Sequence, residues 1–335
     1  MSFRVSPMNF LKYCLDNELS APTHTLDLDN GVRLEVLETG ILRVHPNAQA
    51  ADKPQYRVLI SCGVHGNETA PIEMVETIFN EIKSSNLAVE NELLLIIGNP
   101  PAINRAERFV DENLNRLFSG EHTGSDSQEA VRARLIEMHV EQFFSEGEEP
   151  RLHYDLHTAI RGSQFEKFAV YPYLHNRTWS KPQIAFLERC GLGAVLLSSQ
   201  PSGTFSYYTS NRFGVDSFTI ELGKVAKFGD NDMRKFSDAM QGLRDVISGR
   251  ECFQAEAKSI KIFTVVEEVM KRSNELKFHF PEDAKNFTEF PKGSVLVSDQ
   301  AYKYKTQCDG ERFVFPIINV PVGQRAVLIV KPISI

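Results

Sequence analysis

Apolar and polar positions follow two different patterns along the chain, one before about residue 250 and one after it. Residues 56–63 (YRVLISCG) form an apolar run typical of a buried strand, and residues 70–85 (APIEMVETIFNEIKSS) have the apolar spacing of a helix. Strand and helix patterns go on alternating to about residue 249, with further strands predicted in NELLLIIGNP, LHYDLHTAI and VDSFTIELGK. This alternation predicts an α/β domain with a mostly parallel sheet and helices on both of its faces.

The two ends of the chain have other patterns. Ser6 and Pro7 are expected to start a short N-terminal helix, and Asp29, Asn30 and Gly31 between two alternating runs predict a hairpin. After residue 251 the runs become short, β-type and interrupted by Pro, Gly and Asp, as in ELKFHF and RAVLIVKPI. We therefore expect a main α/β domain over residues 1–252 and a smaller β-rich domain over residues 253–335.

Composition narrows the class of protein. The 335 residues carry a formal net charge of -7, which argues against a nucleic-acid partner because such partners select basic surfaces. The N-terminus lacks the apolar core of a signal peptide, and no apolar run is long enough to span a membrane. The chain has five scattered cysteines and no CxxC pair, which favours reduced thiols over a disulfide framework. We expect a cytoplasmic protein without membrane or nucleic-acid partners, and its oligomeric state stays open.

The first candidate for chemistry is the sequence SCGVHGNETAP, residues 61–71. His65 and Glu68 follow a buried strand directly, and in α/β proteins functional sites form where loops leave the carboxyl ends of strands. A catalytic zinc ion takes about three protein ligands, and two histidines with one glutamate are a known set. The alternative is an ordinary histidine beside a carboxylate that the helix dipole favours. The flanking glycines favour a metal site because they let the backbone and an ion approach closely.

The sequence HYDLHTA supplies a candidate for the third ligand. His157 ends an alternating run and lies nearest the predicted end of the strand, so we prefer it to His153. These two histidines share one strand face with Asp155 only if the segment stays extended. Ligands from different strands would explain the long separation from His65 and Glu68.

A metal hydrolase also needs a base, and FTIELGK (residues 218–224) contains a candidate. Glu221 lies inside an apolar strand, where a carboxylate is costly without a partner or a function. As a general base it would take a proton from water and deliver it to the leaving amine. The alternative is an ion pair with Lys224 or with an arginine.

The loop sequence NRAERFVDENLNRLFSG, residues 104–120, is rich in arginine and asparagine. Arginine binds carboxylates through two hydrogen bonds and can stabilise an oxyanion. A charged loop is usually only solvated, but this one follows a predicted parallel strand, where site loops belong. The candidate residues in it are Arg105, Arg108, Asn113, Asn115 and Arg116.

Together the blocks GVHGNE, ENLNRLF, DLHTA and IELG resemble the succinylglutamate desuccinylase/aspartoacylase family of the zinc carboxypeptidase-like superfamily. The resemblance covers about residues 55–225 by motif and the whole chain by layout, because this family carries a β-rich C-terminal domain. It implies a zinc-carboxypeptidase-like α/β fold, one zinc ion per chain, and amide hydrolysis of a small anionic N-acyl amino acid. The chain length and the sequence DLHTAIRGS look most like members that act on N-succinylglutamate in arginine catabolism.

The resemblance also implies roles for individual residues. It places the zinc ligands at His65, Glu68 and His157 and the catalytic glutamate at Glu221. It places the arginine that polarises the scissile carbonyl at Arg108.

Further positions follow for the substrate. Asn115 and Arg116 match the pair that binds a substrate carboxylate, and Arg161 and Arg212 are additional candidates for this role. Arg212 is one residue away from the position of the family arginine. Asn113 replaces a family aspartate, so this chain has no negative charge at that position for a role in the site. Tyr302 and Tyr304 are candidates, without a motif, for a C-terminal tyrosine of aspartoacylases.

Other functions stay open from the sequence alone. An aspartoacylase-like enzyme would use the same chemistry on another N-acyl amino acid, and a peptidase of the superfamily would use it on peptides. A non-catalytic binding protein of the same fold belongs to a different functional class. The sequence does not set the acyl group, the native metal or the role of the C-terminal domain from first principles.

Overall fold

The structure is a computed structural model that describes residues 9–47, 55–250, 252–253 and 256–334. Its main feature is one sheet of 13 strands in the order β1-β2-β3-β5-β4-β6-β9-β7-β8-β10-β16-β15-β12. The strands of its first nine positions are β1 (His24–Asp27), β2 (Arg33–Glu38), β3 (Ile41–His45), β4 (Arg57–Cys62), β5 (Glu92–Ile97), β6 (Arg151–Ala159), β7 (Phe168–Tyr171), β8 (Ala194–Leu197) and β9 (Asp216–Lys224).

The centre of the sheet is mostly parallel, as predicted. β5, β4, β6 and β9 pair in parallel, and so do β7 and β8. The antiparallel neighbours β7 and β9 are the exception. β7, a strand of only four residues that the sequence pattern did not reveal, joins the two parallel groups.

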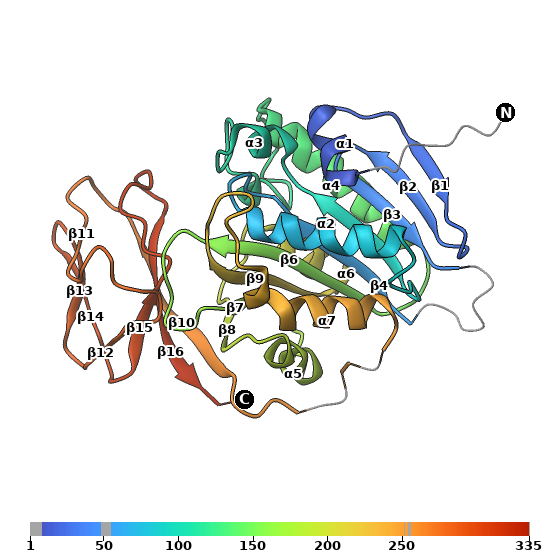
Figure 1. Cartoon of the computed structure of the whole chain (residues 1–335). Helices are drawn as coiled ribbons and strands as arrows, with labels where there is room; N and C mark the ends of the chain where they lie inside the picture. Colours follow the sequence, from blue (N-terminus) through green and yellow to red (C-terminus); the bar gives the residue numbers. More distant parts are fainter. Residues whose placement is uncertain (1–8, 48–54, 251, 254–255, 335) are drawn as a thin grey trace.

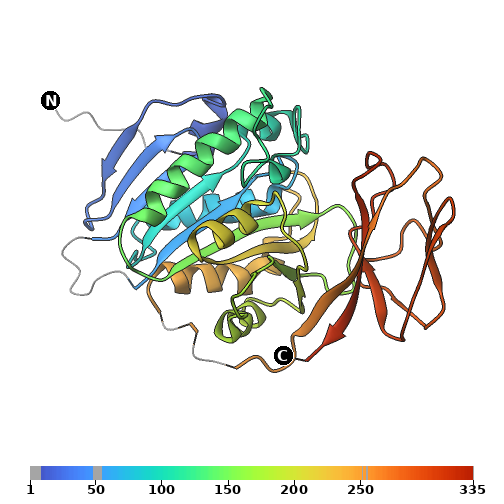
Figure 2. The same ribbon diagram turned by 180° about the vertical axis from the view of Figure 1, so that it is seen from behind.

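Helices cover both faces of this sheet, which confirms the α/β prediction (Figures 1 and 2). One face packs against α1, α2, α5 and α7, and the other against α4 and α6, because alternate residues of the strands belong to two separate apolar clusters. The helices are α1 (Phe10–Asp16), α2 (Thr69–Lys83), α3 (Pro100–Arg105), α4 (Gln128–Ser145), α5 (Lys181–Arg189), α6 (Phe205–Phe213) and α7 (Ser237–Ile247), with short 3-10 turns η1 (Leu114–Arg116) and η2 (Met233–Phe236).

Capping side chains define several of these helix starts. Ser127 accepts a hydrogen bond from the backbone of Ala130 at the start of α4, and Thr204 does the same for Tyr207 at the start of α6. The N-terminal helix α1 has Asn9 as its cap. Ser6 and Pro7, which were expected to start it, lie outside the described residues. The predicted hairpin is present as the antiparallel pair β1 and β2.

The C-terminal part is rich in β-structure, as predicted, but the large sheet runs into it without a break. Parallel pairing of β8 with β10 joins the two parts, and a separate three-stranded sheet contains β11, β13 and β14. The predicted boundary between residues 252 and 253 stays a prediction. The strands are β10 (Lys261–Met270), β11 (Lys277–Phe278), β12 (Glu289–Phe290), β13 (Val295–Asp299), β14 (Tyr302–Lys305), β15 (Glu311–Val314) and β16 (Arg325–Ile333).

Two further expectations concern the whole chain. Among the described helices, none is long and apolar enough to cross a membrane. All five cysteines are free; four are buried and Cys308 is exposed.

Candidate metal centre and active site

A glycine-containing turn after β4 carries the first two candidate ligands. Gly63 has a φ of +62°, which favours glycine, and directs the chain away from the sheet. Gly66 lies directly on α3, since a Cβ there would be 2.2 Å from the backbone carbonyl carbon of Ala102. Glu68 then caps α2. The glycines of the GVHGNE block thus let the turn pack tightly against its neighbour and fix the positions of His65 and Glu68.

The structure brings His65, Glu68 and His157 together. One potential ligand atom of each lies within 4.8 Å of the others, and all three residues are buried. His65 Nδ1 lies 2.8 Å from Glu68 Oε1, and His157 Nδ1 lies 3.0 Å from Glu68 Oε2. The imidazole ring centres are 5.0 Å apart. Both rings therefore point the same type of nitrogen toward one carboxylate.

The far side of each ring is held by another side chain. His65 Nε2 is 2.9 Å from Asn113 Oδ1, and His157 Nε2 is 2.9 Å from Asp155 Oδ2. Because an amide oxygen and a carboxylate can only accept, each Nε2 carries the proton and donates it. When Nδ1 carries no proton, its lone pair faces Glu68 and can bind a cation, the arrangement that metal-binding histidines usually show.

The residues present fit a divalent metal ion. Two imidazoles and one carboxylate are a donor set that such ions accept. His65 Nδ1 is buried and makes no well-directed hydrogen bond, although Glu68 lies close to it. Burial alone would raise the pKa of Glu68, but the charges of His65 and His157 offset this and hold its pKa well below the usual value. Glu68 is thus an anion, as a ligand must be.

A buried polar row continues behind His157 along β6. Asp155 accepts a hydrogen bond from Ser61 Oγ of β4 at 2.6 Å, and His153 Nε2 lies 2.9 Å from the same hydroxyl group. His153 Nδ1 lies 2.8 Å from Thr209 Oγ1 of α6. β6 is extended through this row, so the three polar side chains share one face, and burial lowers the pKa of His153 to about 4. The structure places His157 in the ligand cluster and gives His153 a neutral supporting position.

Glu221 lies on the neighbouring strand, directly opposite His157 in the pairing of β6 with β9. It is buried, and its Oε2 makes no hydrogen bond with any part of the chain that the structure describes. The same described residues include no ion-pair partner for it, so the alternative of a salt bridge with Lys224 is not what the structure has. Burial, followed by the charge of Glu68, raises the pKa of Glu221 to about 7. A carboxyl group with such a pKa can both accept and release a proton near neutral pH.

The loop after β5 brings three further predicted residues to this place. Arg108 Nη1 donates a hydrogen bond to Glu68 Oε1 at 2.7 Å. Asn115 Oδ1 accepts from the backbone N–H of Phe205 at 2.9 Å, and its Nδ2 lies 3.5 Å from His157 Nε2. Arg116 follows in η1 and is exposed to solvent. Arg105, at the end of α3, is exposed as well.

The structure does not bring the remaining candidates into this cluster. Arg212 lies on the outer side of α6, where its Nη2 is 2.7 Å from Glu141 Oε1. Arg161 donates to the backbone carbonyl groups of Glu282 and Ala284, and it lines a cavity of about 230 Å³ with Lys224 and Lys285.

The two tyrosine candidates are engaged inside the C-terminal part. The hydroxyl group of Tyr302 donates to Glu267 at 3.1 Å, and that of Tyr304 donates to Glu311 at 2.7 Å.

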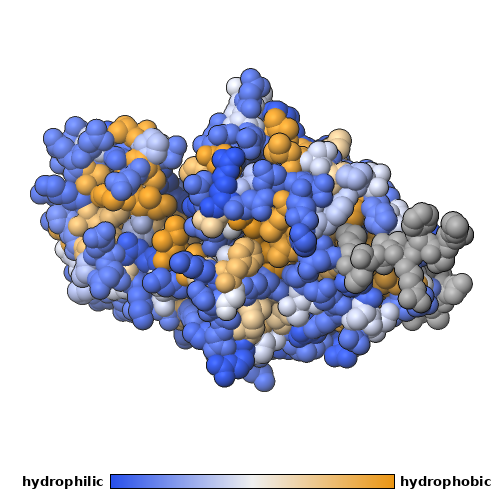
Figure 3. Space-filling model, turned by 45° about the horizontal axis from the view of Figure 1, so that its top comes forward, coloured by the Kyte–Doolittle hydropathy of each residue, from blue (hydrophilic) through white to orange (hydrophobic). Residues whose placement is uncertain are grey.

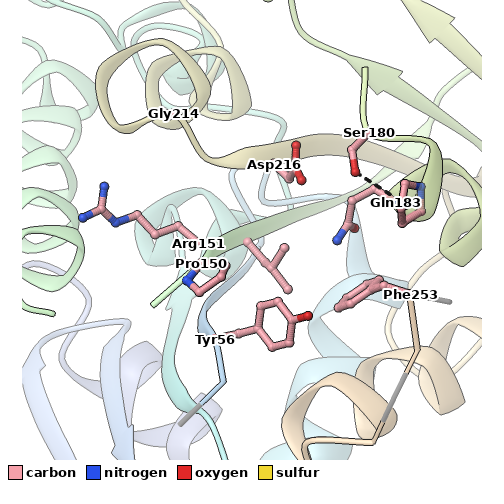
Figure 4. Close-up of a pocket in the computed structure, with 10 residues that line it drawn as sticks. Tyr56, Pro150, Arg151, Ser180, Gln183, Gly214, Asp216 and Phe253 are labelled. Carbon is pink, nitrogen blue, oxygen red and sulfur yellow. Dashed lines mark hydrogen bonds between the residues drawn. The ribbon is translucent and has the colours of Figure 1, made fainter. Parts of the chain in front are cut away.

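A second cavity, of about 420 Å³, lies at the opposite edge of the sheet (Figure 4). Arg151 and Asp216, the first residues of β6 and β9, line it, whereas His157 and Glu221 lie toward the carboxyl ends of the same strands. It holds no group of the metal cluster. The candidate active site is therefore at the carboxyl edge, where parallel sheets place their sites.

The supporting roles of Ser61, Asn113, Asp155 and Thr209 were not predicted, although Asn113 and Asp155 were named beside the candidate ligands. A signal for Asp155 existed, since HYDLH alternates polar residues at a period of two inside an otherwise apolar strand. Asn113 lies in the asparagine- and arginine-rich loop, but its contact with His65 depends on which loops become neighbours. Nothing local marks Ser61 or Thr209, for the same reason.

Comparison with known proteins agrees with this architecture. The family model for the succinylglutamate desuccinylase/aspartoacylase catalytic domain matches residues 54–247, and the model for the AstE/AspA barrel-sandwich hybrid domain matches residues 258–333. The succinylglutamate desuccinylase of Shewanella pealeana is 44% identical over 312 residues, which cover 91% of this chain and 90% of the relative. That of Pseudoalteromonas atlantica is 43% identical over 311 residues, 90% and 88% of the two chains.

Solved structures agree as well. The succinylglutamate desuccinylase structure from Vibrio parahaemolyticus superposes with a TM-score of 0.90 at 33% identity, covering 98% of this chain and 97% of that one. The one from Chromobacterium violaceum gives a TM-score of 0.87 at 37% identity, with coverage of 98% and 99%. Both parts of the chain are thus matched by these proteins, and the chain belongs to the succinylglutamate desuccinylase/aspartoacylase family.

Proposed function

We propose that this protein hydrolyses the amide bond of N-succinylglutamate to succinate and glutamate, with one zinc ion per chain. The observation that carries the proposal is the His65–Glu68–His157 cluster beside the unpaired carboxyl group of Glu221. Relatives at more than 40% identity over nine tenths of the chain bear the name succinylglutamate desuccinylase, which supports this substrate.

The three ligands would hold the zinc ion through His65 Nδ1, the Glu68 carboxylate and His157 Nδ1. Zinc, when bound there, would polarise the amide carbonyl and lower the pKa of a water molecule. Asn113 and Asp155 would keep the two imidazoles in the correct tautomer and orientation.

Glu221 is the proton carrier of the proposed reaction. Its carboxylate accepts a proton from the attacking water and then delivers it to the departing amine nitrogen of glutamate. A pKa raised to about 7 by burial suits both steps, because the group changes its protonation state at little cost near neutral pH.

Arg108 and the pair Asn115–Arg116 would bind the substrate. Arg108 lies beside Glu68, where its guanidinium can stabilise negative charge that develops on the carbonyl oxygen. Asn115 is fixed by the backbone of Phe205, so its amide group is positioned before substrate arrives. Arg116 offers a positive charge to one of the substrate's three carboxylates.

An amine-release assay tests this function. Purified zinc-loaded protein is given N-succinylglutamate, N-acetylaspartate, N-succinylarginine and short peptides, before and after treatment with a chelator. We expect N-succinylglutamate to give the highest kcat/KM, chelation to abolish it and zinc to restore it. Glu221→Gln should lower kcat about 10²- to 10⁴-fold while the zinc content stays near one per chain.

Each rival function has its own result in this assay. Preference for N-acetylaspartate or for peptides would assign the chain to another hydrolase activity. Binding of N-succinylglutamate without any amine release would indicate a non-catalytic protein. A near-normal rate in Glu221→Gln would remove Glu221 as the base.

A further inference from the structure

The strands of the C-terminal part bring an arginine toward the loop that carries Arg116. Arg325 is the first residue of β16, which pairs with β10. On β10, Glu268 Oε1 accepts a hydrogen bond from Ser199 Oγ at 3.1 Å. Ser199 lies in the loop after β8, and a Cβ on Gly203 of that loop would lie 2.4 Å from the carbonyl oxygen of Arg116. The loop after β8 therefore contacts both the backbone of Arg116 and β10, the strand whose Met270 pairs with Arg325.

Among the residues that the structure describes, no carboxylate forms an ion pair with the guanidinium group of Arg116 or of Arg325. Arg116 Nη1 donates to the carbonyl group of Asn115 at 2.7 Å, which leaves its charge unpaired. For Arg325, the described part of the chain provides no hydrogen bond and no ion pair. Glu268 acts on it only as a nearby charge. Two positive groups that repel each other are stabilised when an anion binds to both.

The electrostatics agree with this geometry. Arg116 is accessible to solvent, yet desolvation, followed by repulsion from Arg325 and Arg108, lowers its pKa to about 10. Desolvation likewise lowers the pKa of Arg325. Figure 3 shows a notch between the C-terminal part, at the left, and the α/β part.

The geometry points to Arg325 as a substrate-binding residue that, together with Arg116, binds one terminal carboxylate of the substrate. This inference rests on the proposed function and adds to it that the C-terminal part contributes to substrate specificity. Two guanidinium groups can give one carboxylate several charge-assisted hydrogen bonds. A substrate without that carboxylate would leave both arginines unpaired, so the site would reject it.

Steady-state kinetics with modified substrates test this role. The substrates are N-succinylglutamate, N-succinylglutamine and N-succinamoylglutamate; each of the latter two has one terminal carboxylate replaced by a neutral amide. The variants are Arg325→Met, Arg325→Lys and, as a control that removes a charge from the same strand, Lys331→Met. Circular dichroism and zinc content confirm that each variant folds.

For N-succinylglutamate, we expect Arg325→Met to raise KM about 10- to 100-fold with a smaller change in kcat. Arg325→Lys should recover part of the loss, and Lys331→Met should behave as wild type. For one of the two amide substrates, Arg325→Met and wild type should give the same kcat/KM, because the missing charge is the one that Arg325 binds. An equal loss on all three substrates, or no loss on any, would overturn the inference.

Calorimetric binding of succinate and of glutamate to zinc-loaded protein separates this inference from the proposed function. If wild type fails to release amine but Arg325→Met weakens the binding of one of these carboxylates about tenfold or more, the arginine site stands and the hydrolase proposal falls. If wild type hydrolyses N-succinylglutamate and Arg325→Met matches it in kinetics and binding, the hydrolase proposal stands and the role of Arg325 is refuted.

Discussion

At the scale of single residues, the candidate site places charges where they destabilise the fold. Glu221 is buried without a hydrogen-bond partner for Oε2, and its pKa is raised to about 7. A carboxyl group with a raised pKa binds its proton more tightly in the folded than in the unfolded protein. This tighter proton binding stabilises the folded protein. The stabilisation is complete below the ordinary pKa of a glutamate and is lost as the pH rises through about 7.

Glu221→Gln removes this pH dependence. We expect the zinc-free variant to match zinc-free wild type near pH 4.5 and to exceed it in unfolding free energy above pH 7, by at most about 3 kcal/mol. Urea unfolding of both proteins between pH 4.5 and 8 measures the difference. A gap that is constant with pH would show that Glu221 titrates alike in the folded and unfolded chains.

Asn113 acts on the metal through His65. Its Oδ1 accepts from His65 Nε2 and also from the backbone N–H of Asn115. Asn113→Ala should weaken zinc binding about 10- to 100-fold, the usual effect of losing a group that orients a ligand. Asn113→Asp keeps the acceptor and should restore the affinity. Competition against a chelator measures both values, and equal zinc affinity in wild type and Asn113→Ala would refute the orienting role.

Residues with a chemical role of their own could be found from the sequence, whereas their partners could not. His65, Glu68, His157 and Glu221 stand in short blocks next to glycines or at the ends of apolar runs. The proposed role of Arg325 could not be predicted from the sequence, since this residue lies in an ordinary β-type run. Its place in the structure depends on the pairing of β16 with β10. Arg212 had a plausible position in the sequence, but the turn of α6 directs it to Glu141 on the surface.

At the scale of elements, length decided what could be predicted. Long periodic segments such as α2 and α4 were predictable because many residues repeat one pattern. β7 has four residues and α3 has six, so neither shows enough periods to be recognised. α3 also begins at Pro100 shortly after the strand β5, and proline suits the first turn of a helix.

The packing of α3 against the metal-binding turn leads to a prediction for Gly66. A Cβ at this position would lie 2.2 Å from the carbonyl carbon of Ala102, and backbone cannot move aside as a flexible side chain can. Gly66→Ala should destabilise the protein by about 3 kcal/mol and displace His65 from the cluster. Thermal unfolding and zinc content measure the two effects.

Gly162→Ala is the matched control for this variant. A Cβ on Gly162 would meet only Lys285 Cγ, at the ordinary distance of 3.7 Å. Its stability should stay within about 0.5 kcal/mol of wild type. If both variants were equally stable, the close approach of Gly66 to α3 would not be what fixes the turn.

At the scale of the whole molecule, the sequence indicated two parts but not how they join. The change from mixed to β-type runs near residue 251 is visible because it is a change of local pattern. Pairing of β8 with β10 is not visible, because it depends on which strand edge remains free after the α/β part has folded. The result is a single sheet that continues from one part into the other.

This continuity predicts the behaviour of a chain cut at the expected boundary. An apolar cluster crosses it: Phe168 and Leu196 on β7 and β8 pack with Phe263, Phe287 and Leu328 of the C-terminal part. Residues 1–252 alone would expose these side chains and the unpaired edge of β8, and such edges promote aggregation. We expect this fragment to aggregate and to bind no stoichiometric zinc, as measured by size-exclusion chromatography and metal analysis. A monomeric, zinc-binding fragment would show instead that the α/β part folds alone and that the shared sheet contributes little to its stability.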